Sequence, residues 1–349
     1  PKVLTANFGK LVGHTVTSVP SGRQVVVDGS TYTTPQAFNW LPGTNHTIGA
    51  TSPQTGVAGT LYVYQGWSDQ GNQSHTVTAP QTAATYTVTF GTQYAIYVDQ
   101  ARGAASADGT QENPYRTIQE GIDHVSSGGT VHVAAGRYTE NLFIDKDVTL
   151  TGSGADKTIL DGSAAMVPTL RFTGVAHGTV DGFYILGGNG SGIRVETSGV
   201  TIQSNIISDV NGSGIEVTSG SQVAILSNWI ISNTQDGLSI LGDIGQVGIV
   251  NNIIAANGRD GIGGINGRNI TITNNIIVSN GGYGVAVDQV PSPLLADNDV
   301  WNNQTGIENG NYLGCMPGAG SLSVDPLFMD AANGDYRLQE GSPCVGIIQ

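Results

Sequence analysis

The chain has 349 residues, a formal net charge of −14 and a pI near 4.5. A chain this acidic is a poor partner for nucleic acid and for anionic membrane surfaces, because both carry negative charge. No run of about 18 apolar residues occurs, so the sequence predicts no membrane insertion. The 51 glycines and the 11% of charged residues are typical of a turn-rich, all-β chain.

The first eight residues match the end of the segment that follows them. Val-Leu-Thr-Ala-Asn-Phe-Gly at 3–9 resembles Tyr-Thr-Val-Thr-Phe-Gly at 86–91. We interpret residues 1–8 as the last strand of a preceding module. Either upstream modules were removed, or this strand pairs with an exposed sheet edge of its own or of a neighbouring molecule. Because the chain starts with Pro1 rather than Met, we expect a mature form or an excised piece.

Residues 9–92 are predicted to form a small β-sandwich module. Short β-rich runs recur at regular spacing, and Asp28-Gly29 is a hairpin signal. The segment resembles a repeat module attached to secreted bacterial proteases and glycan-active enzymes. Its aromatic residues form either a sugar-stacking platform or simply the module's core, and we favour the core: Trp40, Tyr62, Tyr64 and Trp67.

Residues 93–349 open with a predicted helix at about 115–126. Thr117 and Glu120 form a capping box, and Ile118, Ile122 and Val125 share one helical face. We expect this helix to close the open end of the structure that follows, whose first strands otherwise have unpaired edges.

From about residue 175 the sequence repeats with a period of 23 or 24 residues. One column of asparagines marks the period: Asn205, Asn228, Asn252, Asn275 and Asn298. A second column tracks it: Asp209, Asn233, Asn257, Asn280 and Asn303. Each repeat holds two short β-rich runs and no amphipathic helix. The sequence therefore predicts a coil of parallel strands in which equivalent residues stack, the asparagines having a structural role.

Residues 95–349 resemble the right-handed parallel β-helix proteins, a group that includes pectate lyases, many glycosidases and alginate epimerases. The resemblance rests on this repeat, on the entry pattern Asp-Gly-Thr…Asn-Pro-Tyr-Arg-Thr-Ile-Gln at 108–119, and on the closing segment. It implies a secreted, extracellular or cell-surface protein acting on polysaccharide. Residues 311–349 are expected to cap the last turn. A disulfide between Cys315 and Cys344 would staple this cap, although two free thiols are the alternative.

Ionisable residues fall on one outward face of the predicted coil. Equivalent outward positions hold Arg171, Arg194 and Glu216, with Glu196 two residues further along its strand. Asp236, Arg259, Asp260 and Asp288 occupy the same face or the turns beside it. An extended polar face suits an extended polymer, so these residues are the candidate site.

Three functions fit that face. In a lyase of acidic glycans, Arg194 would abstract a proton with Glu216 beside it, Arg171 would bind the sugar carboxylate, and Glu196 and Glu216 would bind Ca²⁺. In a glycoside hydrolase, stacked acids would act in pairs, Glu196 with Glu216 or Asp236 with Asp260. The third is a non-catalytic adhesin or fibre subunit that self-associates through its N-terminal strand. The lyase is our first expectation.

Overall fold

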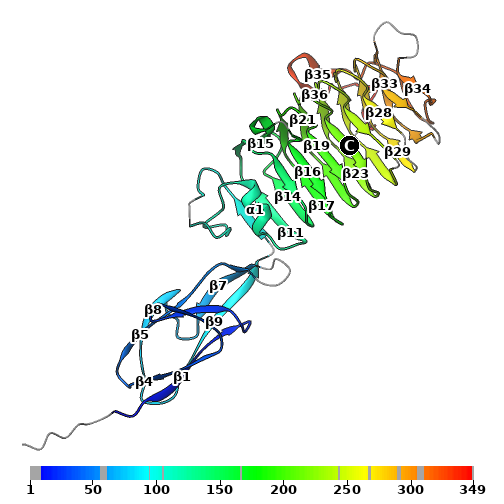
Figure 1. Cartoon of the computed structure of the whole chain (residues 1–349). Helices are drawn as coiled ribbons and strands as arrows, with labels where there is room; N and C mark the ends of the chain where they lie inside the picture. Colours follow the sequence, from blue (N-terminus) through cyan, green and yellow to red (C-terminus); the bar gives the residue numbers. More distant parts are fainter. Residues whose placement is uncertain are drawn as a thin grey trace, which may run out of the picture. The chain divides into compact units, whose positions relative to one another are not determined.

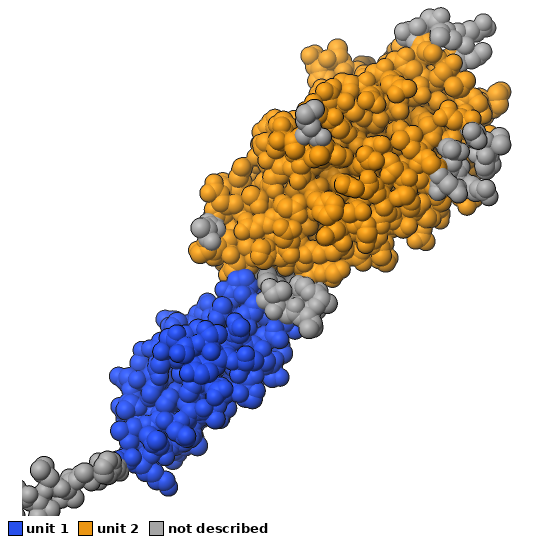
Figure 2. All heavy atoms as spheres, in the orientation of Figure 1, with its two compact units in different colours: residues 1–94 blue, residues 95–349 orange. Residues whose placement is uncertain are grey.

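The computed structural model describes residues 9–55, 61–93, 95–103, 106–165, 167–242, 244–265, 269–288, 292–304 and 310–347. The expected strand at 1–8, and self-association through it, lie outside these residues. The chain divides into two compact units, residues 1–94 and residues 95–349 (Figure 2). Among the described residues, no helix is long and apolar enough to cross a membrane.

The first unit is a sandwich of two sheets. One sheet has the strand order β4–β1–β9–β7–β6, with the bounds β1 Val12–Val19, β4 Gln36–Trp40, β6 Gln54–Thr55, β7 Leu61–Trp67 and β9 Thr85–Gln93. The other has the order β3–β2–β5–β8, with the bounds β2 Gln24–Val27, β3 Ser30–Thr33, β5 Asn45–Ala50 and β8 Ser74–Thr78. All strand pairs are antiparallel except β1 with β9.

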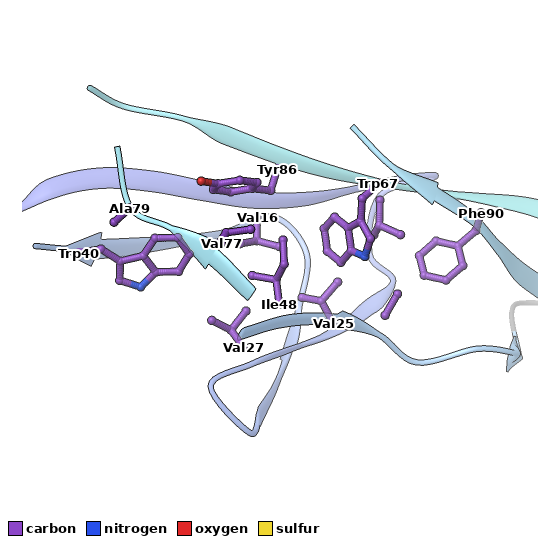
Figure 3. Close-up of a cluster of buried hydrophobic side chains, with 12 residues drawn as sticks. Val16, Val25, Val27, Trp40, Ile48, Trp67, Val77, Ala79, Tyr86 and Phe90 are labelled. Atoms are coloured by element: carbon purple, nitrogen blue, oxygen red, sulfur yellow. The ribbon is translucent and has the colours of Figure 1, made fainter. Parts of the chain in front are cut away.

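The aromatic residues of this unit form its core. Trp40 and Trp67 are each only 5% exposed and lie among the buried valines and Ile48 (Figure 3). Tyr62 and Tyr64 pack against the same cluster. Since a sugar platform needs exposed rings, the core interpretation is confirmed.

The second unit is a coil of about seven turns built from three parallel sheets (Figure 1). The first coil sheet contains β10 Ala95–Val98, β11 Gly129–Val133, β14 Val148–Gly152, β17 Gly178–Asp181, β20 Val200–Gln203, β23 Val223–Leu226, β26 Val247–Val250, β29 Ile270–Thr273 and β32 Leu294–Ala296. The second contains β12 Gly136–Tyr138, β15 Thr158–Asp161, β18 Tyr184–Leu186, β21 Ile206–Ser208, β24 Trp229–Ile231, β27 Ile253–Ala255, β30 Ile276–Val278 and β33 Asp299–Trp301. The third contains β13 Leu142–Ile144, β16 Leu170–Thr173, β19 Ile193–Glu196, β22 Ile215–Ser219, β25 Leu238–Ile240, β28 Ile262–Ile265, β31 Val285–Val287 and β34 Tyr312–Leu313.

Each turn therefore has three strands, and the expectation of two runs per repeat was wrong. The first run is split by a sharp bend into a strand of the first sheet and a strand of the second. At the bend, the residue before the ladder asparagine has a positive φ, as at Ser204 (55°) and Asn251 (59°). The bend turns the chain by leaving one residue in the left-handed region, which ends the strand.

The asparagine column is a buried hydrogen-bond ladder. Asn252 is typical: its Oδ1 accepts from the backbone N and the Nδ2 of Asn228, at 2.9 and 3.0 Å. Its own Nδ2 donates to Ile225 O and to Asn275 Oδ1. The second ladder holds Asn233, Asn257, Asn280 and Asn303. On the turn before Asn233, the equivalent position is Val210, whose backbone N donates to Asn233 Oδ1, and not Asp209 as expected. Both ladders satisfy buried backbone groups where the strands end, so their role is structural.

The predicted helix is confirmed as α1, Ile118–His124, at the start of the coil (Figure 1). Thr117 Oγ1 accepts from Glu120 N as expected. A second cap was not expected: the Glu140 carboxylate accepts from the backbone N of Ile118 and of Gln119, at 2.9 and 3.0 Å. Three buried residues face the coil: Ile118, Gly121 and Ile122.

The C-terminal segment does more than cap the last turn. Residues 319 and 322 form single bridges with the last strands of the first two coil sheets. The chain then turns back, and its hairpin of β35 Phe328–Asp330 and β36 Asp335–Leu338, joined by a 3₁₀ turn at Ala331–Asn333, packs on the outer face of the second sheet. Tyr336 meets Trp229 edge-on, with a ring-centroid distance of 6.0 Å.

A further 3₁₀ turn lies at Gly162–Ala164, directly after β15.

The expected disulfide is not formed: Cys315 and Cys344 are free thiols in the structure. Their surroundings differ. Cys344 is fully buried under the C-terminal hairpin, and its Sγ lies 3.4 Å from Asp299 Oδ2. The Sγ of Cys315 lies 3.9 Å from the carbonyl of Val285, in the third coil sheet. Because the segment between them turns back along the coil, the two thiols are directed to different sheets.

Candidate functional site

The outward residues of the third coil sheet stack as the repeat predicts. In the strand register, Arg171 pairs with Arg194, Arg194 with Glu216, and Glu216 with Ser239. Ser239 in turn pairs with Gly263. One difference is a bulge after Val195, which aligns Glu196 with Ser219 instead of Thr218. The predicted column is confirmed over these turns.

The two arginines are joined by carboxylates into a chain of four charges. Arg171 donates from Nε and Nη2 to Glu196 Oε2, at 2.9 and 2.6 Å. Arg194 Nε lies 2.8 Å from Glu196 Oε1, although its N–H is not aligned for a hydrogen bond. Arg194 Nη1 lies 3.8 Å from Glu216 Oε2, which also accepts from Ser191 Oγ at 2.9 Å. Both guanidiniums therefore contact protein carboxylates, which offsets their mutual repulsion.

A polar groove of about 520 Å³ lies beside this chain of charges. It brings together five predicted site residues: Glu216, Asp236, Arg259, Asp260 and Asp288. The remaining predicted site residues, Arg171, Arg194 and Glu196, belong to the adjoining part of the same face and do not line the groove.

Asp236 and Asp260 occupy equivalent turns that lead into β25 and β28. Asp236 Oδ1 accepts from Asp260 N at 3.1 Å, and Asp260 Oδ1 accepts from Tyr283 N at 2.7 Å. Each aspartate is therefore held by the backbone of the next turn. These bonds use Oδ1 of each carboxylate, and Ser239 forms a further hydrogen bond with the Asp236 carboxylate.

The Asp236 and Asp260 side chains both pack closely against Gly263. A Cβ at this position would lie 3.2 Å from Asp236 Cγ and 3.1 Å from Asp260 Oδ2. Asp236 Cγ and Asp260 Oδ2 are therefore at most about 6.3 Å apart, a limit that is compatible with the separation of about 5–5.5 Å in retaining glycosidases.

Both carboxyl groups hold their protons more tightly than ordinary aspartates. Burial raises the pKa of Asp236, and this effect exceeds the opposing effects of the Asp260 N–H and of the Arg259 charge, whose Nε lies 4.0 Å away. Burial also raises the pKa of Asp260, and the charges of Asp236 and Asp288 raise it further. Two coupled acids with raised pKa values in one groove are typical of acid–base sites.

No group of three or more His, Cys, Asp or Glu residues that could hold a metal ion occurs in the described part of the chain. Glu196 and Glu216, the predicted Ca²⁺ ligands, contact Arg171, Arg194 and Ser191.

Several groove residues were not predicted from the sequence. They are uncharged residues of two neighbouring turns, of β25 and of the position directly after it: Asn189, Ser191, Asn211, Ser213, Ser239 and Leu241. A signal was present, because Asn-Gly-Ser-Gly occurs at both 189–192 and 211–214. A repeated polar tetrapeptide in the turn before the charged column indicates a second wall of the same groove.

Comparison with known proteins bears on this coil. Residues 169–314 match the family model described as a right handed beta helix region. The coil is a right-handed parallel β-helix. A cell surface glycoprotein of Methanothermus fervidus is 32% identical over 131 residues, which cover 36% of this chain and 21% of that protein. The matched part of the chain thus spans about a fifth of this relative's length.

The chain is also similar to two solved structures. Pectate lyase Pel9A is 13% identical, with a TM-score of 0.48, over 71% of this chain and 90% of its own. A rhamnogalacturonan lyase is 13% identical, with a TM-score of 0.41, over 61% of this chain and 75% of its own. Identities this low carry no information about activity.

Proposed function

We propose that the β-helix acts on a polysaccharide at the cell surface or outside the cell, and that its groove hydrolyses a glycosidic bond with Asp236 and Asp260. The observation that carries this proposal is the placement of two neighbouring carboxyl groups, Asp236 buried and Asp260 half-buried, both with raised pKa values and both lining the polar groove. The extracellular or surface location is supported by the similarity to a cell surface glycoprotein.

The pair supplies both functions that hydrolysis needs. One carboxyl group keeps its proton and donates it to the glycosidic oxygen as that bond breaks. The other, ionised, attacks the anomeric carbon and forms a glycosyl ester. A water molecule then loses a proton to the first carboxylate, displaces the ester and restores both groups, so that one water is consumed per bond.

The charges in the groove favour an uncharged substrate. Glu216, Asp236, Asp260 and Asp288 line it, and among the described residues Arg259 is the one lining residue with a positive charge. A polyuronate would meet several carboxylates, whose repulsion in a partly buried site is strong. The lyase prediction is less well supported, because the guanidiniums of Arg171 and Arg194 already contact Glu196.

The test is incubation of the full chain with laminarin, dextran, xylan and galactomannan, with release of reducing ends as the measurement. We expect activity on a neutral glycan and a loss of about 10²–10⁴-fold in Asp236→Asn and in Asp260→Asn. Asp181→Asn is the matched control, because its carboxyl group lies on the first coil sheet outside the groove. Full activity in both groove variants would exclude the assigned pair.

The same assay includes polygalacturonate and alginate, with Ca²⁺ or with EDTA. Formation of unsaturated uronates, lost in Arg194→Ala and in EDTA, would support the lyase and its metal instead.

A non-catalytic surface protein is the second candidate, and the similarity to a cell surface glycoprotein favours it. If the protein is non-catalytic, the wild-type chain should cleave none of the neutral glycans and neither polygalacturonate nor alginate.

A further inference from the structure

An exposed aromatic side chain stands at the beginning of the charged column. Phe143 lies in β13, the first strand of the third coil sheet, and is 44% exposed. Single exposed apolar residues are common on protein surfaces, so exposure by itself indicates nothing. The position is informative, because Phe143 pairs in register with Arg171. The same column of paired residues continues through Arg194 and Glu216 to Ser239, which lines the groove.

The backbone and the neighbourhood of Phe143 are fixed. Gln119 of α1 clamps the strand edge: its Oε1 accepts from Phe143 N at 2.9 Å, and its Nε2 donates to Phe143 O at 3.1 Å. On the coil side, the Arg171 guanidinium lies over the phenyl ring at 5.8 Å and is itself anchored by Glu196. Because this backbone is already fixed, little main-chain freedom is lost when a ligand stacks on the ring.

We propose that Phe143 is a distal stacking subsite for the glycan that occupies the groove. This inference rests on the proposed polysaccharide substrate. From Phe143 to Ser239 the column crosses four strand steps of about 4.8 Å, or about 19 Å. That span exceeds a disaccharide, so the substrate is a chain long enough to contact the groove and Phe143 together. The apolar face of a sugar ring packs on the phenyl ring, and the free N–H groups of Arg171 donate to the adjacent hydroxyls.

The experiment is affinity electrophoresis of the full chain in gels containing laminarin, dextran, xylan or galactomannan. Phe143→Ala should weaken retardation by about fivefold in the gel that retards the wild type, as expected for the loss of one aromatic contact. Phe143→Trp should restore it, because it supplies a larger ring. Leu294→Ala is the matched control, since Leu294 is 66% exposed on the first coil sheet.

Each outcome decides the proposal. Equal retardation of wild type and Phe143→Ala overturns the distal subsite and leaves the hydrolytic pair untouched. Weakened retardation without release of reducing ends supports the subsite and overturns hydrolysis. If none of the four glycans retards the wild type, the subsite is overturned. Loss of retardation in Leu294→Ala as well would show a general surface effect and would also overturn it.

Discussion

The carboxyl groups on the outer face of the third coil sheet have different roles because their neighbours differ. Glu196 contacts two guanidiniums and serves to balance charge. Asp236 and Asp260 are held by backbone N–H groups beside a glycine, and burial keeps their pKa values high. The difference arises from partners on adjacent turns, so an acid here is interpretable only together with the residues stacked above and below it.

A third carboxyl group, Asp299, gives a test of pH-dependent stability. It is completely buried beneath the C-terminal segment, and its Oδ1 accepts from Val324 N at 3.0 Å. Burial raises the pKa of Asp299, and the charge of Asp325 raises it further, while hydrogen bonds from Val324 and Cys344 oppose the rise. The folded state therefore binds this proton more tightly than the unfolded state. Protonated Asp299 therefore contributes to the free energy of unfolding at low pH. This contribution is lost as the pH rises above about 4, the pKa of an unfolded aspartate, and through the raised pKa of the folded state.

We accordingly expect Asp299→Asn to gain stability relative to wild type as the pH rises. The asparagine Oδ1 still accepts from Val324 N, but the side chain no longer has to ionise in a buried position. Urea unfolding of both proteins at an acidic and at a neutral pH measures the two differences in free energy of unfolding. The same difference at both values would contradict the raised pKa.

At the scale of single elements, the bends between strands are stabilised by the asparagine ladders. Every turn of a parallel coil leaves backbone groups unpaired where a strand ends, and these groups are buried. Each ladder amide satisfies two backbone groups of the preceding turn. Its oxygen accepts from an N–H and its nitrogen donates to a carbonyl, as Asn252 does for Asn228 N and Ile225 O. The ladder therefore links each turn to the next through buried hydrogen bonds.

Asn252→Ala should reduce the free energy of unfolding by about 3 kcal/mol or more, because it leaves the backbone N–H of Asn228 without an acceptor in a buried position and removes one of the two hydrogen bonds that the Asn228 Nδ2 donates. Asn211→Ala is the matched control: Asn211 is exposed, and its amide donates to Asn189 Oδ1 on the surface. Its effect should be within about 0.5 kcal/mol. Equal effects of the two substitutions in urea unfolding would show that the ladder is not a major source of stability.

At the scale of the whole β-helix, the three outer faces have different uses. The third sheet carries the charged column and the groove, and the outward residues of the first sheet from Thr201 to Ala296 are uncharged. The second sheet has an apolar outer face with Trp229, Ile253 and Ile276, which the C-terminal segment covers. The end of the chain thus stabilises turns in the middle of the coil as well as the last one.

Tyr336→Ala should detach this segment before the coil itself unfolds. Tyr336 is 4% exposed and packs edge-on against Trp229 and Phe328, so its loss should cost about 3–5 kcal/mol. The substitution should lower the free energy of local unfolding of the hairpin. Trypsin should therefore cut faster after Arg337 while the coil remains resistant. Met329→Ala is the control on the same hairpin, because Met329 is 53% exposed. Unchanged cleavage in Tyr336→Ala would show that the hairpin is not held by this contact.

The sequence by itself determined the features that follow from local repetition. A period of 23 or 24 residues specifies which side chains stack, so Arg171, Arg194 and Glu216 could be placed in one column, and the asparagines in ladders. The capping pattern at Thr117 likewise predicted α1, because a helix start depends on a few adjacent residues. Asp236, Arg259, Asp260 and Asp288 were assigned to this face for the same reason.

Only the tertiary structure decided the features that depend on contacts between distant segments. A positive φ at Ser204 divides one β-rich run into two strands, and hydrophobic periodicity does not reveal it. The groove joins Asn189 and Asn211, from two neighbouring turns, with acids from other turns of the coil. The C-terminal segment turns back because the outer face of the second sheet offers a complementary apolar surface. That packing, more than the spacing of Cys315 and Cys344, determines where the two thiols lie.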